Sequence, residues 1–255
     1  MRVHVVSDVH ARADALAKAG DGADALICLG DLVLFLDYDD PGGGIFADMF
    51  GADAAQRLIR LRTERRFDEA RDFSAGLWAQ IGRPPREAIE EAIRGQYADL
   101  FAAMPTPAYV TYGNVDVPAL YAEYVRDGIT VLDGETAVIG GRRFGFVGGG
   151  LRTPMRTPYE IDDDEYAAKV AALGRVDVLC AHIPPDVPEL LYDVEARRME
   201  RGSAALLEAI RETQPDLVLF GHVHNPLVRR TRIGRTECVN VGHFRGRGTP
   251  HVVEW

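Results

Sequence analysis

The sequence has few cysteines and no long apolar run, and each shortage argues against a class of protein. The three cysteines, Cys28, Cys180 and Cys238, are odd in number and far apart, which argues against a disulfide framework or a zinc ribbon. No apolar run reaches the ~20 residues of a membrane span, and Met1 leads almost directly into a strand pattern instead of a signal peptide. We therefore expect a soluble, cytoplasmic protein with no membrane partner.

Lysine is also scarce, and acidic side chains outnumber basic ones. Lysine occurs only at Lys18 and Lys169, and 29 basic against 39 acidic side chains leave a formal net charge of −10. A chain of this sign is a poor partner for nucleic acid, so we expect none. The 255 residues, 47% hydrophobic and 27% charged, suit one large globular domain or two small ones.

Short apolar runs alternate with helical patterns along most of the chain. Nearly continuous apolar runs are typical of strands buried on both faces, and their alternation with helices predicts an α/β protein. The runs are Val3–Val6, Ala25–Leu29, Tyr109–Tyr112, Val176–Ala181 and Leu217–Phe220, and the helical patterns lie at about 12–19, 118–125, 162–173 and 203–213.

Two stretches have the pattern of short strands instead. They are residues 130–147 and the tail from about 227 to 254. In the first stretch Asp133-Gly134 and Gly140-Gly141 are both good hairpin signals. The sequence therefore predicts a second, more antiparallel set of strands.

A helical segment also interrupts the alternation. Residues 45–103 follow the breaker Pro41-Gly42-Gly43-Gly44 and keep helical spacing, with one break expected at about 82–85. We predict a single domain over residues 1–255 with this helical insertion at about 45–103. Because its ends lie close in sequence to polar strand ends, we expect the insertion to form a cap or a partner surface.

Each predicted strand ends in residue types that bind metals. Because the carboxyl ends of strands gather along one edge of an α/β sheet, we expect these side chains to lie together. Carboxylate, amide and imidazole groups suit borderline divalent ions such as Mn, Fe, Ni or Zn. The candidate ligands are Asp8, His10, Asp31, Asn114, His182, His222 and His224.

Seven ligands are too many for one tetrahedral ion. They suit two ions if one carboxylate bridges, and Asp31, the lone aspartate after its strand, is the natural bridge. Paired ions about 3.5–4 Å apart are typical of phosphoryl-transfer hydrolases. His4, inside the first strand pattern, and His251, near the C-terminus, are predicted to be structural.

The order of these motifs resembles the calcineurin-like metallophosphoesterases. The resemblance implies a four-layer α-β-β-α sandwich of two mixed β-sheets flanked by helices. It also implies two divalent ions, with manganese favoured, and their ligand sets. One ion takes Asp8, His10, Asp31 and His224, and the other takes Asp31, Asn114, His182 and His222.

Two departures from the family pattern bear on the reaction. Many members carry a histidine after the asparagine, which is held to protonate the leaving oxygen or bind phosphate, and this chain has Val115 there. The small bacterial phosphodiesterase branch also lacks that histidine, which favours diesters. Its Asn-Pro-Gly-Ser turn is similar to Asn240-Val241-Gly242-His243, with Pro and Ser replaced. His243 or a metal-bound water is the predicted substitute acid, and Asp116 is predicted to orient a metal-bound imidazole.

The sequence thus predicts a dinuclear metal-dependent phosphoesterase that prefers diesters, with a metal-bridging hydroxide as nucleophile. Asp31, Asn114 and His243 are the predicted catalytic residues. Asn114 and Arg12 are the predicted substrate contacts, because a guanidinium matches phosphate geometry, although Arg12 also suits a solvated helix start. The expected partner is a small phosphate ester, with a nucleotide among the candidates, and a homo-oligomer is left open. The alternatives are a phosphomonoesterase, a nucleotide pyrophosphatase and a non-catalytic metal-binding scaffold.

Overall fold

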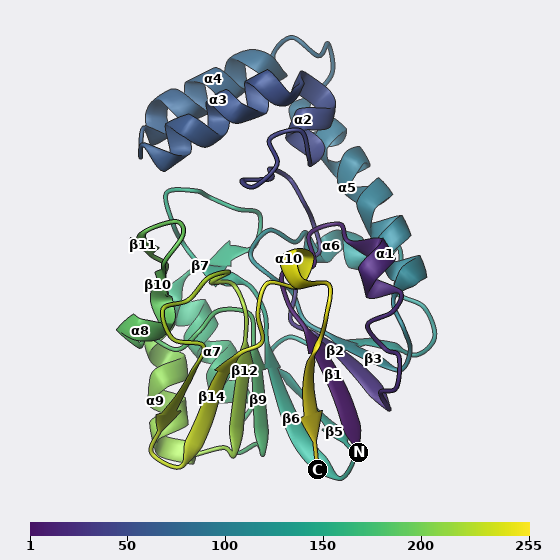
Figure 1. The fold of residues 1–255 in the computed structure, drawn as a ribbon, viewed down its shortest axis with the longest axis vertical. Helices are drawn as coiled ribbons and strands as arrows, with labels where there is room; N and C mark the ends of the chain where they lie inside the picture. The colour runs from purple at the N-terminus through teal and green to yellow at the C-terminus, as the bar shows by residue number, and fades with distance from the viewer. The chain divides into compact units, whose positions relative to one another are not determined.

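The computed structural model describes all 255 residues (Figure 1). The chain forms two compact units: residues 1–32 together with 100–255 make the larger one, and residues 33–99 make the smaller one. None of the helices combines the length and the apolar character that crossing a membrane requires.

A five-stranded sheet in the larger unit begins with the N-terminal strand. Its order is β15-β1-β2-β3-β4, where β1 to β4 are parallel and β15 pairs antiparallel with β1 at the edge. The two chain ends therefore meet, and the Met1 amine donates to the Trp255 carbonyl oxygen at 2.5 Å (Figure 1). The strands are β1 (Arg2–Val6), β2 (Ala25–Cys28), β3 (Ala108–Val110), β4 (Ile129–Val131) and β15 (His251–Glu254).

A six-stranded sheet supplies the other half of the larger unit. Its order is β13-β14-β12-β9-β6-β5, with four parallel strands in the centre and an antiparallel strand at each edge. The strands are β5 (Glu135–Ile139), β6 (Arg142–Val147), β9 (Val178–Ala181), β12 (Leu217–Phe220), β13 (Arg230–Ile233) and β14 (Thr236–Asn240).

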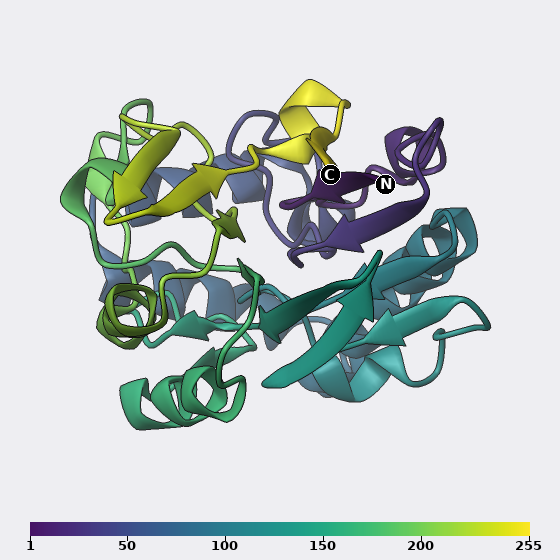
Figure 2. The same ribbon diagram turned by 90° about the horizontal axis from the view of Figure 1, so that it is seen from below.

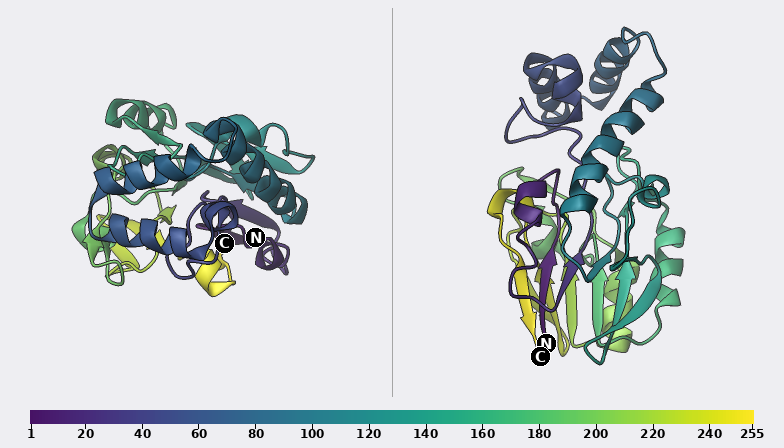
Figure 3. Two further views of the ribbon diagram at one scale, coloured as in Figure 1. Left: turned by 90° about the horizontal axis from the view of Figure 1, so that it is seen from above. Right: turned by 90° about the vertical axis from the view of Figure 1, so that its right-hand side faces the viewer.

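The two sheets pack face to face, as Figures 2 and 3 show. Val5 and Ile27 of the first sheet share one buried cluster with Phe146 and Leu219 of the second. On the outer face of the six-stranded sheet lie α7 (Asp163–Ala172) and α9 (Ala204–Thr213), which belong to a second cluster. The short helices α1 (Ala13–Leu16) and α6 (Pro118–Tyr121) lie in connections between strands of the five-stranded sheet, α1 between β1 and β2 and α6 between β3 and β4. The predicted four-layer sandwich of two mixed sheets flanked by helices is confirmed.

One of the two expected hairpins does not form. Gly140 and Gly141 make a two-residue turn between β5 and β6, and both have positive φ, as such turns require. Asp133-Gly134 instead carries the chain from β4 in one sheet to β5 in the other. The Asp133 carboxylate is engaged outside the turn, where it accepts from the Gly148 N–H and from Lys169.

Several predicted helices are shorter than their patterns, and the smallest elements were not predicted at all. The patterns at 12–19 and 118–125 each yield only one helical turn, α1 and α6. Two-residue strands are too short to show periodicity. The elements without a sequence signal are β7 (Gly150–Leu151), β8 (Glu160–Ile161), β10 (Tyr192–Asp193), β11 (Arg198–Met199), α8 (Pro188–Leu191) and α10 (Phe244–Arg247).

The smaller unit is helical, as predicted, but it has more breaks than its sequence suggests. The expected break near 82–85 is present, and the chain also breaks at Gly51 and at residues 64–66, where Gly51 and Arg65 adopt left-handed backbone. Nothing at 64–66 is Gly or Pro, so no local signal marks that break. The helices are α2 (Ile45–Phe50), α3 (Ala52–Thr63), α4 (Phe67–Trp78) and α5 (Pro85–Ala103), and α2 to α4 enclose a core of Phe46, Leu58 and Trp78.

Candidate metal centre

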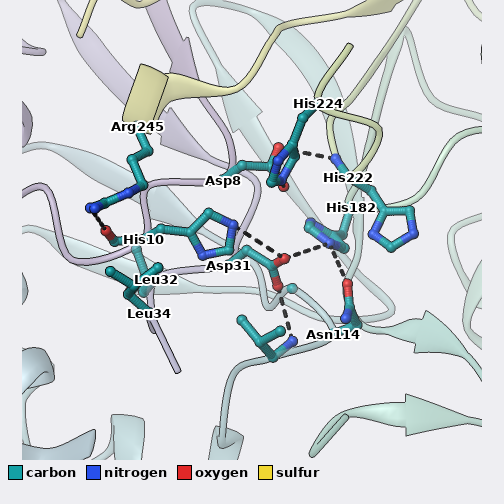
Figure 4. A network of polar contacts seen from close by, with 12 residues as sticks. Asp8, His10, Asp31, Leu32, Leu34, Asn114, His182, His222, His224 and Arg245 are labelled. Carbon is teal, nitrogen blue, oxygen red and sulfur yellow. Dashed lines mark hydrogen bonds and ion pairs between the residues drawn. The ribbon is translucent and has the colours of Figure 1, made fainter. Parts of the chain in front are cut away.

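All seven predicted ligands come together in the larger unit, in the loops that follow five parallel strands (Figure 4). Such strands present their carboxyl ends at one edge of each sheet, and the packing of the two sheets brings the two edges together. The ligands are Asp8 and His10 after β1, Asp31 after β2, Asn114 after β3, His182 after β9, and His222 and His224 after β12.

Asp31 lies between the two halves of the cluster (Figure 4). Its Oδ2 atom is 3.9 Å from His10 Nε2 and 3.5 Å from His182 Nε2. Its other oxygen, Oδ1, accepts the Val115 backbone N–H at 3.0 Å, which fixes the carboxylate plane. One oxygen of Asp31 therefore faces ligands of both predicted ions, as a bridging carboxylate must.

The loops that carry the ligands are conformationally strained. Asp8, His10, Asp31 and His222 all have φ between 43° and 66°, a region that residues other than glycine rarely adopt. Each such residue costs on the order of 1 kcal/mol or more, and such strain collects at functional sites. The surrounding contacts must hold these turns in place, which aims the side chains inward.

The motif glycines allow the loops to approach one another closely. A Cβ atom on Gly113 would lie 2.0 Å from Asp31 Oδ1, and one on Gly221 would lie 1.9 Å from Ser7 Oγ. Any side chain at these positions would displace a ligand loop, so the glycines before Asn114 and His222 are required for contact between the loops.

Asp116 ties two ligand loops together through their backbones. Its buried carboxylate accepts the N–H groups of Asp31, Leu32 and Gly113 at 2.8–2.9 Å. Burial and the nearby charge of Asp31 raise the pKa of Asp116 to about 6. In the structure Asp116 organises the backbone around Asp31 and Asn114. The expectation that it orients a metal-bound imidazole stays a prediction.

The charges inside the cluster favour bound cations. Burial alone would raise the pKa of Asp8, but the neighbouring His224 imidazole, through its contact with the carboxylate and its charge, holds that pKa well below its usual range. Burial also opposes ionisation of Asp31, whose pKa is nevertheless lowered by the charge of His182. Burial lowers the pKa of His182, whereas the Asp31 charge outweighs it and raises that pKa to about 9. Two ionised carboxylates thus draw positive charge into the site, as protons on imidazoles or as metal ions that replace them.

The donor atoms fit two divalent ions. Two groups have ligand atoms within 4.8 Å of one another, namely Asp8 with His10 and Asp31, and Asp31 with His182 and His222. The Asp8 Oδ1 atom is buried without a hydrogen-bond donor, and a bound cation would satisfy it. Mixed nitrogen and oxygen donors suit the borderline ions.

The remaining predicted ligands lie beside these two groups. His224 Nε2 is 3.5 Å from Asp8 Oδ1, and Asn114 Oδ1 is 3.0 Å from His182 Nε2. The Nδ1 atom of His182 lies 3.0 Å from the Leu29 carbonyl oxygen, to which it donates. That bond leaves Nε2 as the atom available to an ion, the usual arrangement for a metal-binding histidine.

Asn240, in the tail that resembles the Asn-Pro-Gly-Ser turn, holds the histidine loop. Its amide nitrogen donates to the carbonyl oxygens of Gly221 at 3.2 Å and Val223 at 2.9 Å, and its Oδ1 accepts the Gly242 N–H at 2.8 Å. The side chain is fully buried. Asn240 is therefore a positioning residue for His222 and His224, a role that the sequence alone did not reveal.

Arg12 and the two structural histidines lie outside the ligand cluster. The Arg12 guanidinium donates to Asp14 at 3.0 Å and to the Arg245 carbonyl oxygen at 2.8 Å. The bond to Asp14 is local to the start of α1, the bond to Arg245 joins this loop to the C-terminal tail, and the phosphate contact stays a prediction. His4 is buried with Nδ1 2.8 Å from the Ala19 carbonyl oxygen, and His251 lies in the edge strand β15.

Thr157, which sequence reasoning missed, fixes the orientation of the Asn114 amide. Its Oγ1 atom accepts from Asn114 Nδ2 at 3.0 Å and donates to Glu160 Oε1 at 2.9 Å. The Asn114 carbonyl oxygen also accepts the Tyr159 N–H at 2.9 Å. The loop between β7 and β8 therefore holds Asn114 on two sides, and the amide oxygen is left to face His182.

A Thr157→Val substitution is expected to weaken binding of the ion on the Asn114 side by about 10–100-fold, the usual cost of losing an outer partner of a metal ligand. Thr157→Ser keeps the hydroxyl and should bind as the wild type does. Competition against a chelator of known affinity measures both constants. Equal affinity in Thr157→Val and wild type would remove this role from Thr157.

A four-layer sandwich with carboxylate, amide and imidazole donors gathered at its strand ends defines the class of metal-dependent phosphoesterases. The family model for calcineurin-like phosphoesterases matches residues 1–226, and the chain belongs to this family, as the motifs indicated. Metal-dependent phosphoester hydrolysis is the activity that membership suggests.

The chain is similar in structure to the protein described as "GAP50 the anchor in the inner membrane complex of Plasmodium", with 10% sequence identity and a TM-score of 0.40. That likeness covers 95% of this chain and 71% of the other. No curated protein matches the chain.

Proposed function

We propose that the chain is a dinuclear metal-dependent phosphodiesterase. The observation that carries the proposal is the place of Asp31, whose Oδ2 atom faces His10 on one side and His182 on the other. One ion would be held by Asp8, His10, Asp31 and His224, and the other by Asp31, Asn114, His182 and His222. Bound divalent ions would supply Lewis-acid stabilisation of phosphate oxygens and an activated water.

The chain's own residues have distinct tasks in this proposal. Asp31 keeps the two halves of the site in register, because its carboxylate is pinned by the Val115 N–H. Asn114 presents its amide oxygen toward His182, while its amide nitrogen is held by Thr157. Asp8 and His182 are almost fully buried, which strengthens their charge interactions with a bound ion.

Val115 supports the preference for diesters through the resemblance to the small phosphodiesterase branch, which also lacks a histidine at this position. Its backbone N–H serves Asp31, but its aliphatic side chain can neither bind a phosphate oxygen nor deliver a proton. A leaving group that departs without protonation is therefore favoured. Cleavage of phosphomonoesters or nucleotide pyrophosphates on the same site is the second candidate, because the metal ligands place no limit on the rest of the substrate.

Turnover of bis(p-nitrophenyl) phosphate with added Mn²⁺ tests the proposal. We expect hydrolysis that a chelator abolishes and that Mn²⁺ restores, with slower cleavage of alkyl phosphomonoesters. Parallel assays with Zn²⁺, Ni²⁺ and Fe²⁺ test the preference for manganese. The absence of turnover with every ion, in a protein shown to bind two ions, would instead support the non-catalytic scaffold.

Deletion of the smaller unit is expected to separate metal binding from substrate choice. Replacing residues 33–99 by a short Gly-Ser linker removes the insertion but leaves all seven ligands in place. Because the unit has its own buried core, we expect the larger unit to keep both ions while its substrate preference or its oligomeric state changes. An unchanged substrate profile together with an unchanged mass in solution would argue against the predicted cap.

A further inference from the structure

His243 is built into the ligand cluster by the backbone of the C-terminal tail. It precedes α10 and forms a bridge with Ser7, next to the first ligand. The Phe244 N–H donates to the Ser7 carbonyl oxygen at 2.9 Å, and the Arg245 N–H donates to the Asp8 carbonyl oxygen at 3.0 Å. These bonds tie the tail to the loop that carries Asp8 and His10.

The His243 ring lies against two predicted metal ligands. It stacks on His224 with ring centroids 3.8 Å apart and an angle of 8° between planes, and it meets His10 edge-on at 5.8 Å. Ligand atoms of the three rings all lie within 4.8 Å of one another. The Nε2 atom of His243 is buried and has no hydrogen-bond partner, which is costly unless something binds it.

We infer that His243 is an additional nitrogen ligand of the ion held by Asp8, His10 and His224. The inference rests on the metal centre of the proposed function. His243 lies beyond residues 1–226, the part of the chain that matches the family model, and it stands where the similar Asn-Pro-Gly-Ser turn has Ser. Imidazole nitrogens bind an ion at about 2.0–2.1 Å, so two of them sharing it are at most about 4.2 Å apart. The ligand atoms lie within 4.8 Å, close to this limit, but an ion bound by both rings must lie in both ring planes, so the stacked rings of His224 and His243 must turn relative to one another to share it.

A third imidazole would make the two ions unequal. The ion on the His10 side would have three nitrogen ligands, whereas the ion on the Asn114 side has two, with an amide and a carboxylate oxygen. Imidazole-rich sites select Zn, Ni, Cu or Fe, and oxygen-rich sites suit Mn. We therefore expect the His10 side to prefer Zn²⁺ or Co²⁺ over Mn²⁺ more strongly than the Asn114 side.

Ligation and proton donation make different demands on His243. A proton donor needs an N–H within hydrogen-bond reach of the leaving oxygen. A ligand needs a neutral ring with a free nitrogen that faces the other ligands. The buried, unpartnered Nε2 atom satisfies that demand.

The test compares Co²⁺ binding and its visible spectrum in wild type, His243→Ser, His243→Asp and the control His251→Ser. We expect His243→Ser to weaken one of the two Co²⁺ ions by at least about tenfold and to change the d–d bands. His243→Asp returns a donor atom and should recover part of the affinity. His251→Ser removes an imidazole in β15 and should match wild type. Circular dichroism confirms that each variant is folded.

If wild type binds two ions and the His243→Ser variant has the same affinities and the same spectrum, His243 is not a ligand. The proposed dinuclear centre would remain intact. Slower cleavage of poor leaving groups in that same variant would then assign His243 as the proton donor. Wild type that binds fewer than two ions would overturn the dinuclear centre, and the inference with it.

Discussion

An Asp31→Asn chain is expected to hold fewer than two ions. Its rate of bis(p-nitrophenyl) phosphate hydrolysis should fall by more than the ~10–100-fold that is usual when an outer partner of a metal ligand is changed. The substitution keeps the side chain's size but removes the negative charge between His10 and His182. Because both ions would share this carboxylate, its loss should affect both, in contrast to the one-sided effect of Thr157→Val. Elemental analysis after gel filtration gives the metal content per chain.

The matched control for the Asp31 variant is Asp177→Asn. Asp177 also uses its carboxylate to accept a backbone N–H, that of Arg143 at 2.7 Å. It precedes β9 and so lies at the opposite end of this strand from His182. The control should keep two ions and full turnover. If Asp31→Asn also keeps two ions, Asp31 is not the bridge.

The gathering of the seven candidate ligands could be predicted from the sequence because each of them follows its strand closely. Asp8, Asp31 and His182 come one or a few residues after apolar runs that the structure confirms as β1, β2 and β9. A buried strand fixes where its last residues point, and the carboxyl ends of parallel strands meet. The chemistry was therefore visible as local motifs, and only their convergence required the fold.

The residues that hold the ligands could not be predicted in the same way. Thr157 reaches Asn114 across 43 positions of sequence, and Asn240 reaches Gly221 across 19. Neither contact has a local pattern, since a hydroxyl or an amide in a loop is ordinary until its partner is known. The tail motif marked Asn240 as unusual, but only the structure shows that its amide holds the histidine loop.

One turn of the fold also could not be predicted, because its local sequence does not reveal which strands pair. Gly140-Gly141 and Asp133-Gly134 have equally good hairpin signals, yet only the first joins paired strands. Local turn chemistry sets backbone angles, whereas the choice of partner strand depends on which sheet buries the strand. β4 completes the five-stranded sheet and β5 the six-stranded one, so Asp133-Gly134 becomes a crossing between layers.

A Val115→His chain is expected to gain about 10²-fold on alkyl phosphomonoesters and to change little on bis(p-nitrophenyl) phosphate. General acid assistance contributes roughly 10²–10⁴ in rate and matters most when the leaving oxygen is basic. An alkoxide needs a proton to depart, whereas p-nitrophenolate does not. The substitution leaves the backbone N–H that Val115 donates to Asp31, so the predicted bridge should keep its orientation. Steady-state rates on a series of leaving groups give the dependence on leaving-group pKa for each variant.

Val115→Asn is the matched control for this prediction, because it adds a polar side chain that cannot transfer a proton near neutral pH. It should show no gain on alkyl esters, and both variants must be checked for two bound ions, since an added imidazole beside Asn114 can capture an ion. If Val115→His holds two ions and its dependence on leaving-group pKa equals that of wild type, position 115 is not where the leaving oxygen passes. The proton would then come from another group, and the preference for diesters would lose the support that Val115 gives it.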